Sequence, residues 1–436
     1  MLPLLAEAAP SQFLEAVRVG ATGASPVLRG IFGDAEGASS FSTDSAHSSL
    51  LWAMEVCAWS PDHFGLAVDL LARLAEIDPG GRLANRPFAS LEAILLPWFP
   101  QNSVTPKRRL SAIDGLREHH EPLAWRLLLS LLPEMHGASD HISEPQFRDW
   151  KPEKIAVSRP DYWSFIDELY KRILEDVEHD SDRWVVLIDK IDDVPPGSRA
   201  ATLARLDEMS EANHLTDEQR TEIWEALREK VARHREFADA QWALPESEVA
   251  AIERTAAKFE PSAPLERFAW LFKNQRPDIP DAARGENYHE YETALARLRA
   301  EASAAMAHAN SWEEILAFAM TLDVPWFLGE ALAQAERFDY EAEFLRLLGS
   351  ENSAEVTFAA GYAWKRFREA GWEWLDVYLA GGQLPSIQVA RLLLYTNDFP
   401  KAWEVAEARR GRRERILGEL PEPRARRRLR IRDSRR

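Results

Sequence analysis

The sequence predicts an all-α protein, organised as an α-solenoid of stacked helical hairpins. Apolar residues recur at helical spacing along nearly all of the 436 residues, which indicates amphipathic helices and not strands. Many short helical segments follow one another with brief turns, as is typical of helical-repeat arrays. The chain has no clean tetratricopeptide or ankyrin signature. We therefore expect a degenerate array of the HEAT, armadillo or tetratricopeptide kind.

The individual helices can be placed by their apolar stripes and by the residues that begin and end them. The helix over 61–77 has Ser60 as its predicted N-cap and ends at the Asp-Pro-Gly-Gly sequence of 78–81. Thr216–Gln219 and Ser311–Glu314 are capping boxes that each open a further helix. Helices are expected at approximately 11–18, 46–58, 61–77, 88–97, 107–119, 121–132, 161–178, 182–193, 199–211, 217–236, 246–259, 264–273, 286–309, 312–322, 325–337, 339–348, 353–370, 372–380, 385–395 and 399–408.

An irregular stretch from Pro133 to Pro160 interrupts the array. Long loops in compact arrays are usually functional or disordered. This stretch sets a provisional boundary between an N-terminal helical-repeat segment, 1–150, and a C-terminal one, 151–408. The tail 409–436 holds 13 arginines against four acidic residues, in a chain whose net charge is −18. We expect this Arg-rich tail to be disordered.

Composition excludes several classes of protein. Cys57 is the single cysteine, so the chain has no disulfide framework, and a reducing compartment, the cytoplasm, is expected. No apolar run is long enough to cross a membrane. The acidic body repels phosphate backbones, so nucleic acid is not an expected partner except through the basic tail. Cys57 lies among apolar residues and is expected to be a buried small hydrophobe.

The apolar run Trp184–Asp189 is the one segment that also resembles a strand. With Asp192 close behind, it looks like the acidic strand that holds Mg²⁺ in nucleotide-binding proteins. Such a site also needs a Gly-rich phosphate loop with a lysine followed by serine or threonine, and the sequence lacks one. Because Pro195 and Pro196 follow closely, we favour a helix here. We expect no cofactor.

Histidines offer the alternative of a metal-dependent hydrolase. His119, His136 and His141 fall in one region of the sequence, and a catalytic zinc site takes three protein ligands with one position open. The His-Glu-x-x-His motif does not occur, and no matched pair of histidines lies four residues apart on one helix. Structural or surface histidines are the favoured interpretation, so no metal site is assigned.

Two segments have the residue types of a partner-binding surface. In the first, Arg82, Asn85 and Arg86 follow two glycines, so two guanidinium groups are available to a carboxylate or phosphate. In the second, Arg148 and Trp150 belong to a Phe-Arg-Asp-Trp sequence, and Trp and Arg are common interface anchors. The alternative is structural: the first segment would cap neighbouring helices, and Trp150 would pin its own loop.

Three stretches carry a resemblance to known proteins. They are 59–101, which includes Asp-Pro-Gly-Gly-Arg-Leu-Ala-Asn-Arg-Pro, 125–133, which reads Trp-Arg-Leu-Leu-Leu-Ser-Leu-Leu-Pro, and 147–150. Together they resemble the C-terminal helical-repeat region of large bacterial multidomain proteins, some similar to STAND-type P-loop NTPases of antiphage defence. The resemblance implies a sensor segment without catalytic residues of its own. The start inside a helical pattern and the Arg-rich end are expected of a partial product.

These observations lead to one functional expectation. The chain is expected to be a non-enzymatic helical scaffold or sensor segment that binds another protein through a preformed surface. The alternative hypotheses are the metal-dependent hydrolase that would use His119, His136 and His141, and a fragment with no independent function.

Overall fold

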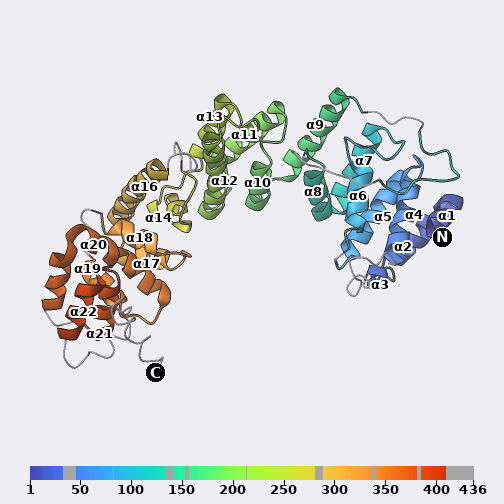
Figure 1. The fold of residues 1–436 in the computed structure, drawn as a ribbon. Coiled ribbons are helices and arrows are strands. Elements are labelled where there is room, and N and C mark those ends of the chain that lie inside the picture. The colour runs from blue at the N-terminus through green and yellow to red at the C-terminus, as the bar shows by residue number, and fades with distance from the viewer. Residues whose placement is uncertain are drawn as a thin grey trace, which may run out of the picture. The chain divides into compact units, whose positions relative to one another are not determined.

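A computed structural model shows that the protein is built from helices, as the sequence predicts. The structure describes residues 1–32, 46–81, 83–133, 141–152, 157–212, 214–279, 288–335, 340–380 and 384–408. Over these ranges it contains twenty-two helices and no strand (Figure 1). The Arg-rich tail, 409–436, lies outside the described residues.

The chain divides into two compact units, Met1–Met209 and Ser210–Arg436. The predicted boundary near residue 150 falls within the first unit. There α8 (Glu121–Ser130) and α9 (Arg159–Asp176) pack against each other, because α9 carries an apolar face that α8 covers.

The helices of the first unit follow the apolar periodicity of the sequence. Buried leucine, isoleucine, valine and alanine side chains fill the space between successive helices, and α5 packs against α2, α4, α6 and α7. The helices are α1 (Leu2–Ala8), α2 (Pro10–Ala21), α3 (Arg29–Phe32), α4 (Ala46–Ala58), α5 (Phe64–Ile77), α6 (Pro87–Leu95), α7 (Pro106–His119), α8 (Glu121–Ser130), α9 (Arg159–Asp176), α10 (Ser181–Asp189) and α11 (Pro196–Glu211).

Ion pairs join α7 to α9 in the first unit. Arg117 on α7 lies 2.7 Å from Asp176, and Arg172 on α9 lies 2.7 Å from Asp114. Hydrogen bonds to Asp176 and burial act in opposite directions on the pKa of Arg117, and the hydrogen bonds prevail and raise it. These guanidinium groups are mostly buried, so the pairs are screened less by salt than surface pairs are.

The second unit contains the remaining helices. A continuous core of aromatic and aliphatic side chains runs from Leu271 to Ala406. The helices are α12 (Asp217–Glu236), α13 (Glu246–Ala257), α14 (Pro264–Arg267), α15 (Trp270–Lys273), α16 (Tyr288–Ala309), α17 (Trp312–Ala319), α18 (Trp326–Leu332), α19 (Glu341–Leu347), α20 (Ser353–Ala380), α21 (Ser386–Leu394) and α22 (Phe399–Ala408).

Two glycines let α18 and α20 approach until their backbones touch. A Cβ atom on Gly329 would lie 2.0 Å from the carbonyl oxygen of Phe358, and one on Gly361 would lie 2.1 Å from that of Trp326. Neither position has room for a side chain. Gly371, at a φ of 60°, breaks α20 where the sequence predicts two separate helices.

Several local predictions can be compared with the structure. Both capping boxes, Thr216–Gln219 and Ser311–Glu314, are present with their reciprocal hydrogen bonds. The run Trp184–Asp189 is helical, which confirms the favoured interpretation. The prediction that Ser60 is the N-cap of this helix was wrong. A tight turn from Ser60 precedes the helix, so α5 begins at Phe64 with His63 at its N-cap.

Candidate functional site

The first predicted binding segment is held by contacts within the chain. Arg82 lies outside the described residues. Arg86 is the N-cap of α6, and its guanidinium, 12% exposed, forms an ion pair with Asp78 at 3.0 Å. The carbonyl oxygen of Asn85 accepts a hydrogen bond from Nε2 of His47 at 3.0 Å. Arg86 and Asn85 therefore tie the connection between α5 and α6 to the first unit.

The second predicted segment, residues 141–152, is fixed to α1 by one carboxylate. Glu7, 3% exposed, accepts backbone N–H groups of Gln146, Phe147 and Arg148. Arg148 also donates from Nε to the carbonyl oxygen of Glu7 at 3.1 Å and from Nη2 to that of Ala8 at 3.2 Å. The side chain of Arg148 thus caps the end of α1.

Trp150 and Phe147 behave differently within this segment. The Trp150 ring meets the ring of His63 edge to face, with centroids 6.2 Å apart, so it pins the loop beside the start of α5. The neighbouring Phe147 is 81% exposed. Arg148 and Trp150 therefore hold the loop against α1 and the start of α5, and Phe147 is the aromatic residue of the segment whose ring is exposed to solvent.

The three histidines of the alternative hypothesis occupy unrelated surroundings where they can be described. Nδ1 of His119 donates to the carbonyl oxygen of Gly115 at 2.9 Å, and the ring of His141 packs edge to face on Phe99. His136 lies outside the described residues. Over the described ranges, no group of three or more His, Cys, Asp or Glu side chains is arranged to hold a metal ion.

Cys57 is buried in α4, as the sequence predicts. Burial raises the pKa of its thiol to about 12. A thiol with such a pKa stays protonated at neutral pH and is a poor nucleophile.

Within the described ranges, no helix is both long and apolar enough to span a membrane.

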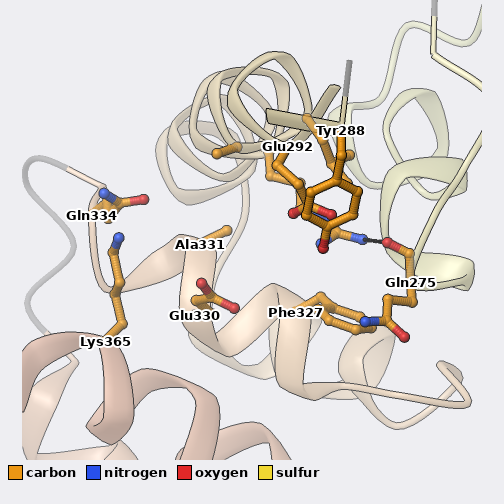
Figure 2. A pocket seen from close by; sticks show the side chains of 11 residues that line it. Gln275, Tyr288, Glu292, Phe327, Glu330, Ala331, Gln334 and Lys365 are labelled. Carbon is orange, nitrogen blue, oxygen red and sulfur yellow. Dashed lines mark hydrogen bonds between the residues drawn. The ribbon is translucent and has the colours of Figure 1, made fainter. Parts of the chain in front are cut away.

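A cavity in the second unit brings together charged side chains that the sequence analysis did not single out. It has a volume of about 160 Å³, and we call it the charged pocket. Figure 2 shows Lys365 and Gln334 at one end of this cavity, Tyr288 and Gln275 at the other, and Glu330 between them. The side chains that define it are Tyr288, Glu292, Arg299, Phe327, Glu330 and Lys365.

Helix packing sets the positions of these side chains. Glu330 belongs to α18 and Lys365 to α20, the two helices that meet through Gly329 and Gly361. The close approach of the two helices brings Glu330, one residue after Gly329, and Lys365, four residues after Gly361, to one cavity. Tyr288 enters the cavity from the first residue of α16.

Arg299 is a buried cation whose hydrogen-bonding capacity is largely used. Nε donates to the carbonyl oxygen of Leu271 at 3.0 Å, and Nη2 donates to those of Asn274 and Gln275 at 3.0 and 3.2 Å. The guanidinium lies 4.4 Å from the centroid of the Phe327 ring. Burial lowers the pKa of Arg299 to about 10. Arg299 therefore caps the end of α15 and closes one wall of the pocket.

The carboxylates of the pocket are compensated less completely than Arg299. Over the described residues, neither Glu292 nor Glu330 forms an ion pair, whereas Lys365 lies 3.5 Å from Glu369. Burial raises the pKa of the Glu330 carboxyl above its usual range, although the charges of Lys365 and Arg299 and a side-chain hydrogen bond with Trp326 oppose that shift. Glu330 therefore has a hydrogen bond and nearby positive charges, but no ion-pair partner among the described residues.

Sequence reasoning missed this pocket because its members are separated in sequence. One signal was available: Glu330 is the single charged residue in the helix Trp-Phe-Leu-Gly-Glu-Ala-Leu. A lone carboxylate in an apolar helix either finds a buried partner or faces a polar cavity.

No protein family, curated protein or solved structure that was compared with the chain matches it.

Proposed function

We propose that this chain is a non-enzymatic helical scaffold that binds another protein, and that the charged pocket receives an arginine side chain of that partner. The observation that supports this most is the half-buried carboxylate of Glu330, which has no ion-pair partner over the described residues. A buried carboxylate is stabilised when a cation that donates hydrogen bonds reaches it.

The size and the walls of the pocket favour a guanidinium over other cations. Its volume of about 160 Å³ is close to that of the roughly 150 Å³ cavity that holds a benzene ring, so it suits one planar group. A guanidinium can donate to two carboxylates at once and also pack against an aromatic ring. Glu330, Glu292 and the ring of Tyr288 line the same cavity.

The wider architecture belongs to the same proposal. We infer that the helices form a degenerate α-solenoid, which is supported by the packing of neighbouring helices in series, as in α19 on α20, α20 on α21 and α21 on α22. Solenoids bind partners along preformed surfaces without chemistry of their own. A cytoplasmic sensor segment of a larger bacterial defence protein is the biological setting that the sequence resemblance suggests.

The test uses a ligand pair that differs in charge and hardly in shape. Nα-acetyl-arginine amide and Nα-acetyl-citrulline amide are titrated into the full chain and followed by chemical-shift changes or by calorimetry. We expect the arginine compound to bind at least about tenfold more tightly, since hydrogen bonds to a charged group contribute more than neutral ones.

Two variants locate the binding. Glu330→Gln keeps the shape of the side chain and removes its charge, and it should abolish the preference for arginine over citrulline. Glu373→Gln is the matched control, because Glu373 is exposed on α20 and is not part of the pocket. Equal binding of the two ligands by the unaltered chain would contradict the proposal.

A further inference from the structure

The two ends of the charged pocket differ in their chemistry. Figure 2 shows Lys365 at one end of the cavity, Tyr288 at the other, and the carboxylate of Glu330 between them. Glu292 also lines the cavity and follows Tyr288 by one turn of α16, on the same face of that helix. The pocket therefore has an ammonium group at one end and carboxylates at its middle and on the wall that Tyr288 shares.

Lys365 is the cation of this pocket whose hydrogen-bond donors are unused. Its nitrogen lies 3.5 Å from the carboxylate of Glu369, farther than the roughly 2.7–2.9 Å of a charge-assisted hydrogen bond. Over the described residues, its ammonium makes no hydrogen bond. Its side chain is 23% exposed, so solvent reaches it. Lys365 can therefore donate to an anion, whereas Arg299 already donates to three backbone carbonyl groups.

The charges that line the pocket balance before any ligand enters. The two carboxylates of Glu292 and Glu330 stand against the two cations of Arg299 and Lys365. A guanidinium that entered alone would leave one positive charge uncompensated in a partly buried cavity, and such a charge is costly. A ligand that carries a carboxylate together with its guanidinium keeps the balance.

The two charged ends also lie close enough for one ligand residue to reach both. Burial raises the pKa of Glu330, and among the charges that oppose this rise that of Lys365 acts most strongly. The ammonium of Lys365 is therefore near the Glu330 carboxylate. In an arginine residue, only Cα and three methylene groups separate the guanidinium from the main-chain carbonyl carbon. That carbon bears a carboxylate only when the arginine is the last residue of its chain.

We propose that the charged pocket recognises arginine as the C-terminal residue of the partner protein. This inference rests on the proposed function and adds the chemistry of the partner. The guanidinium donates to Glu330 and Glu292, and the terminal carboxylate accepts a hydrogen bond from Nζ of Lys365. Capture of a C-terminal carboxylate is a recurring mode of peptide recognition.

The test compares three probes: Nα-acetyl-arginine, Nα-acetyl-arginine amide and L-arginine. Each is titrated into the full chain and followed by calorimetry. We expect Nα-acetyl-arginine to bind about tenfold more tightly than its amide, because its carboxylate adds a charge-assisted hydrogen bond. L-arginine should bind more weakly than Nα-acetyl-arginine, since its α-ammonium group adds an uncompensated positive charge. Equal affinity for the acid and the amide, or tightest binding of L-arginine, would overturn the inference.

Variants assign the preference for the acid to Lys365. Lys365→Met should bind Nα-acetyl-arginine and its amide equally, whereas Lys258→Met, which changes an exposed lysine at the end of α13, should keep the preference. Glu369→Gln removes the carboxylate that competes for Lys365 and should increase the preference. If Lys365→Met fails to fold, Glu369→Gln decides, and an unchanged preference in that variant would overturn the inference.

The same titrations separate this inference from the function on which it rests. If the arginine amide binds better than the citrulline amide but no better or worse than Nα-acetyl-arginine, the arginine site stands and the C-terminal inference is wrong. If the arginine and citrulline amides bind equally, the arginine site itself is wrong, and the inference falls with it.

Discussion

The loop 141–152 of the first unit and the charged pocket of the second both hold charged and aromatic residues, yet they use them in opposite ways. In the loop, the carboxylate of Glu7 accepts three backbone N–H groups, and Arg148 donates to backbone carbonyls. In the pocket, Glu330 has no ion-pair partner over the described residues. Residue type alone therefore does not mark a binding surface, because the chain's own backbone can satisfy the same groups first.

The largest effect should come from breaking the attachment of the loop. Glu7→Ala leaves three backbone donors without their carboxylate, so we expect the free energy of unfolding of the first unit to fall by about 3 kcal/mol. Urea unfolding followed by circular dichroism measures this. Glu15→Ala, which changes an exposed residue of α2, is the control and should cause no measurable change. A Glu7→Ala protein as stable as the parent would show that the loop is not held by this carboxylate.

A comparable loss is expected where α18 meets α20. Gly361→Ala places a Cβ atom 2.1 Å from the carbonyl oxygen of Trp326, and the helices must separate to accept it. Overpacking of this kind costs about 2–3 kcal/mol. Gly115→Ala is the matched change, because a Cβ there meets no atom within 4 Å, and it should be neutral or stabilising. Arginine binding should weaken in Gly361→Ala and persist in Gly115→Ala.

A smaller effect concerns pH. The pKa of Glu330 is raised in the folded state, so between its ordinary value of 4.5 and the raised value the folded chain binds more protons than the unfolded chain. Stability therefore falls as pH rises through this window. Glu330→Gln should flatten that part of the pH–stability curve. Identical curves for the parent and the variant would mean that this carboxyl is not desolvated.

The smallest effect is expected from Arg148→Ala. The Arg148 side chain donates two hydrogen bonds to carbonyl oxygens at the end of α1, and water can replace them at this partly exposed position. We expect a loss of less than about 1 kcal/mol in the same urea experiment. A loss as large as that of Glu7→Ala would assign the attachment of the loop to this arginine.

The sequence predicted the fold class and many helix boundaries because these depend on neighbouring residues. The capping boxes at Thr216 and Ser311 and the break at Gly371 each reflect interactions within a few positions. The pocket and the attachment of the loop could not be predicted in this way. Glu7 meets residues 146–148, and Glu330 shares a cavity with Tyr288, so both depend on tertiary packing that periodicity does not encode.

The proposed arginine site is tested most sharply by the affinity of Nα-acetyl-arginine amide for two variants, Glu330→Gln and Trp150→Ala, measured at a temperature where both variants are folded. We expect Glu330→Gln to lose about tenfold in affinity and Trp150→Ala to bind as the parent does, because the Trp150 ring makes a structural contact with His63. Normal binding by Glu330→Gln together with lost binding by Trp150→Ala would show that arginine is not bound at Glu330.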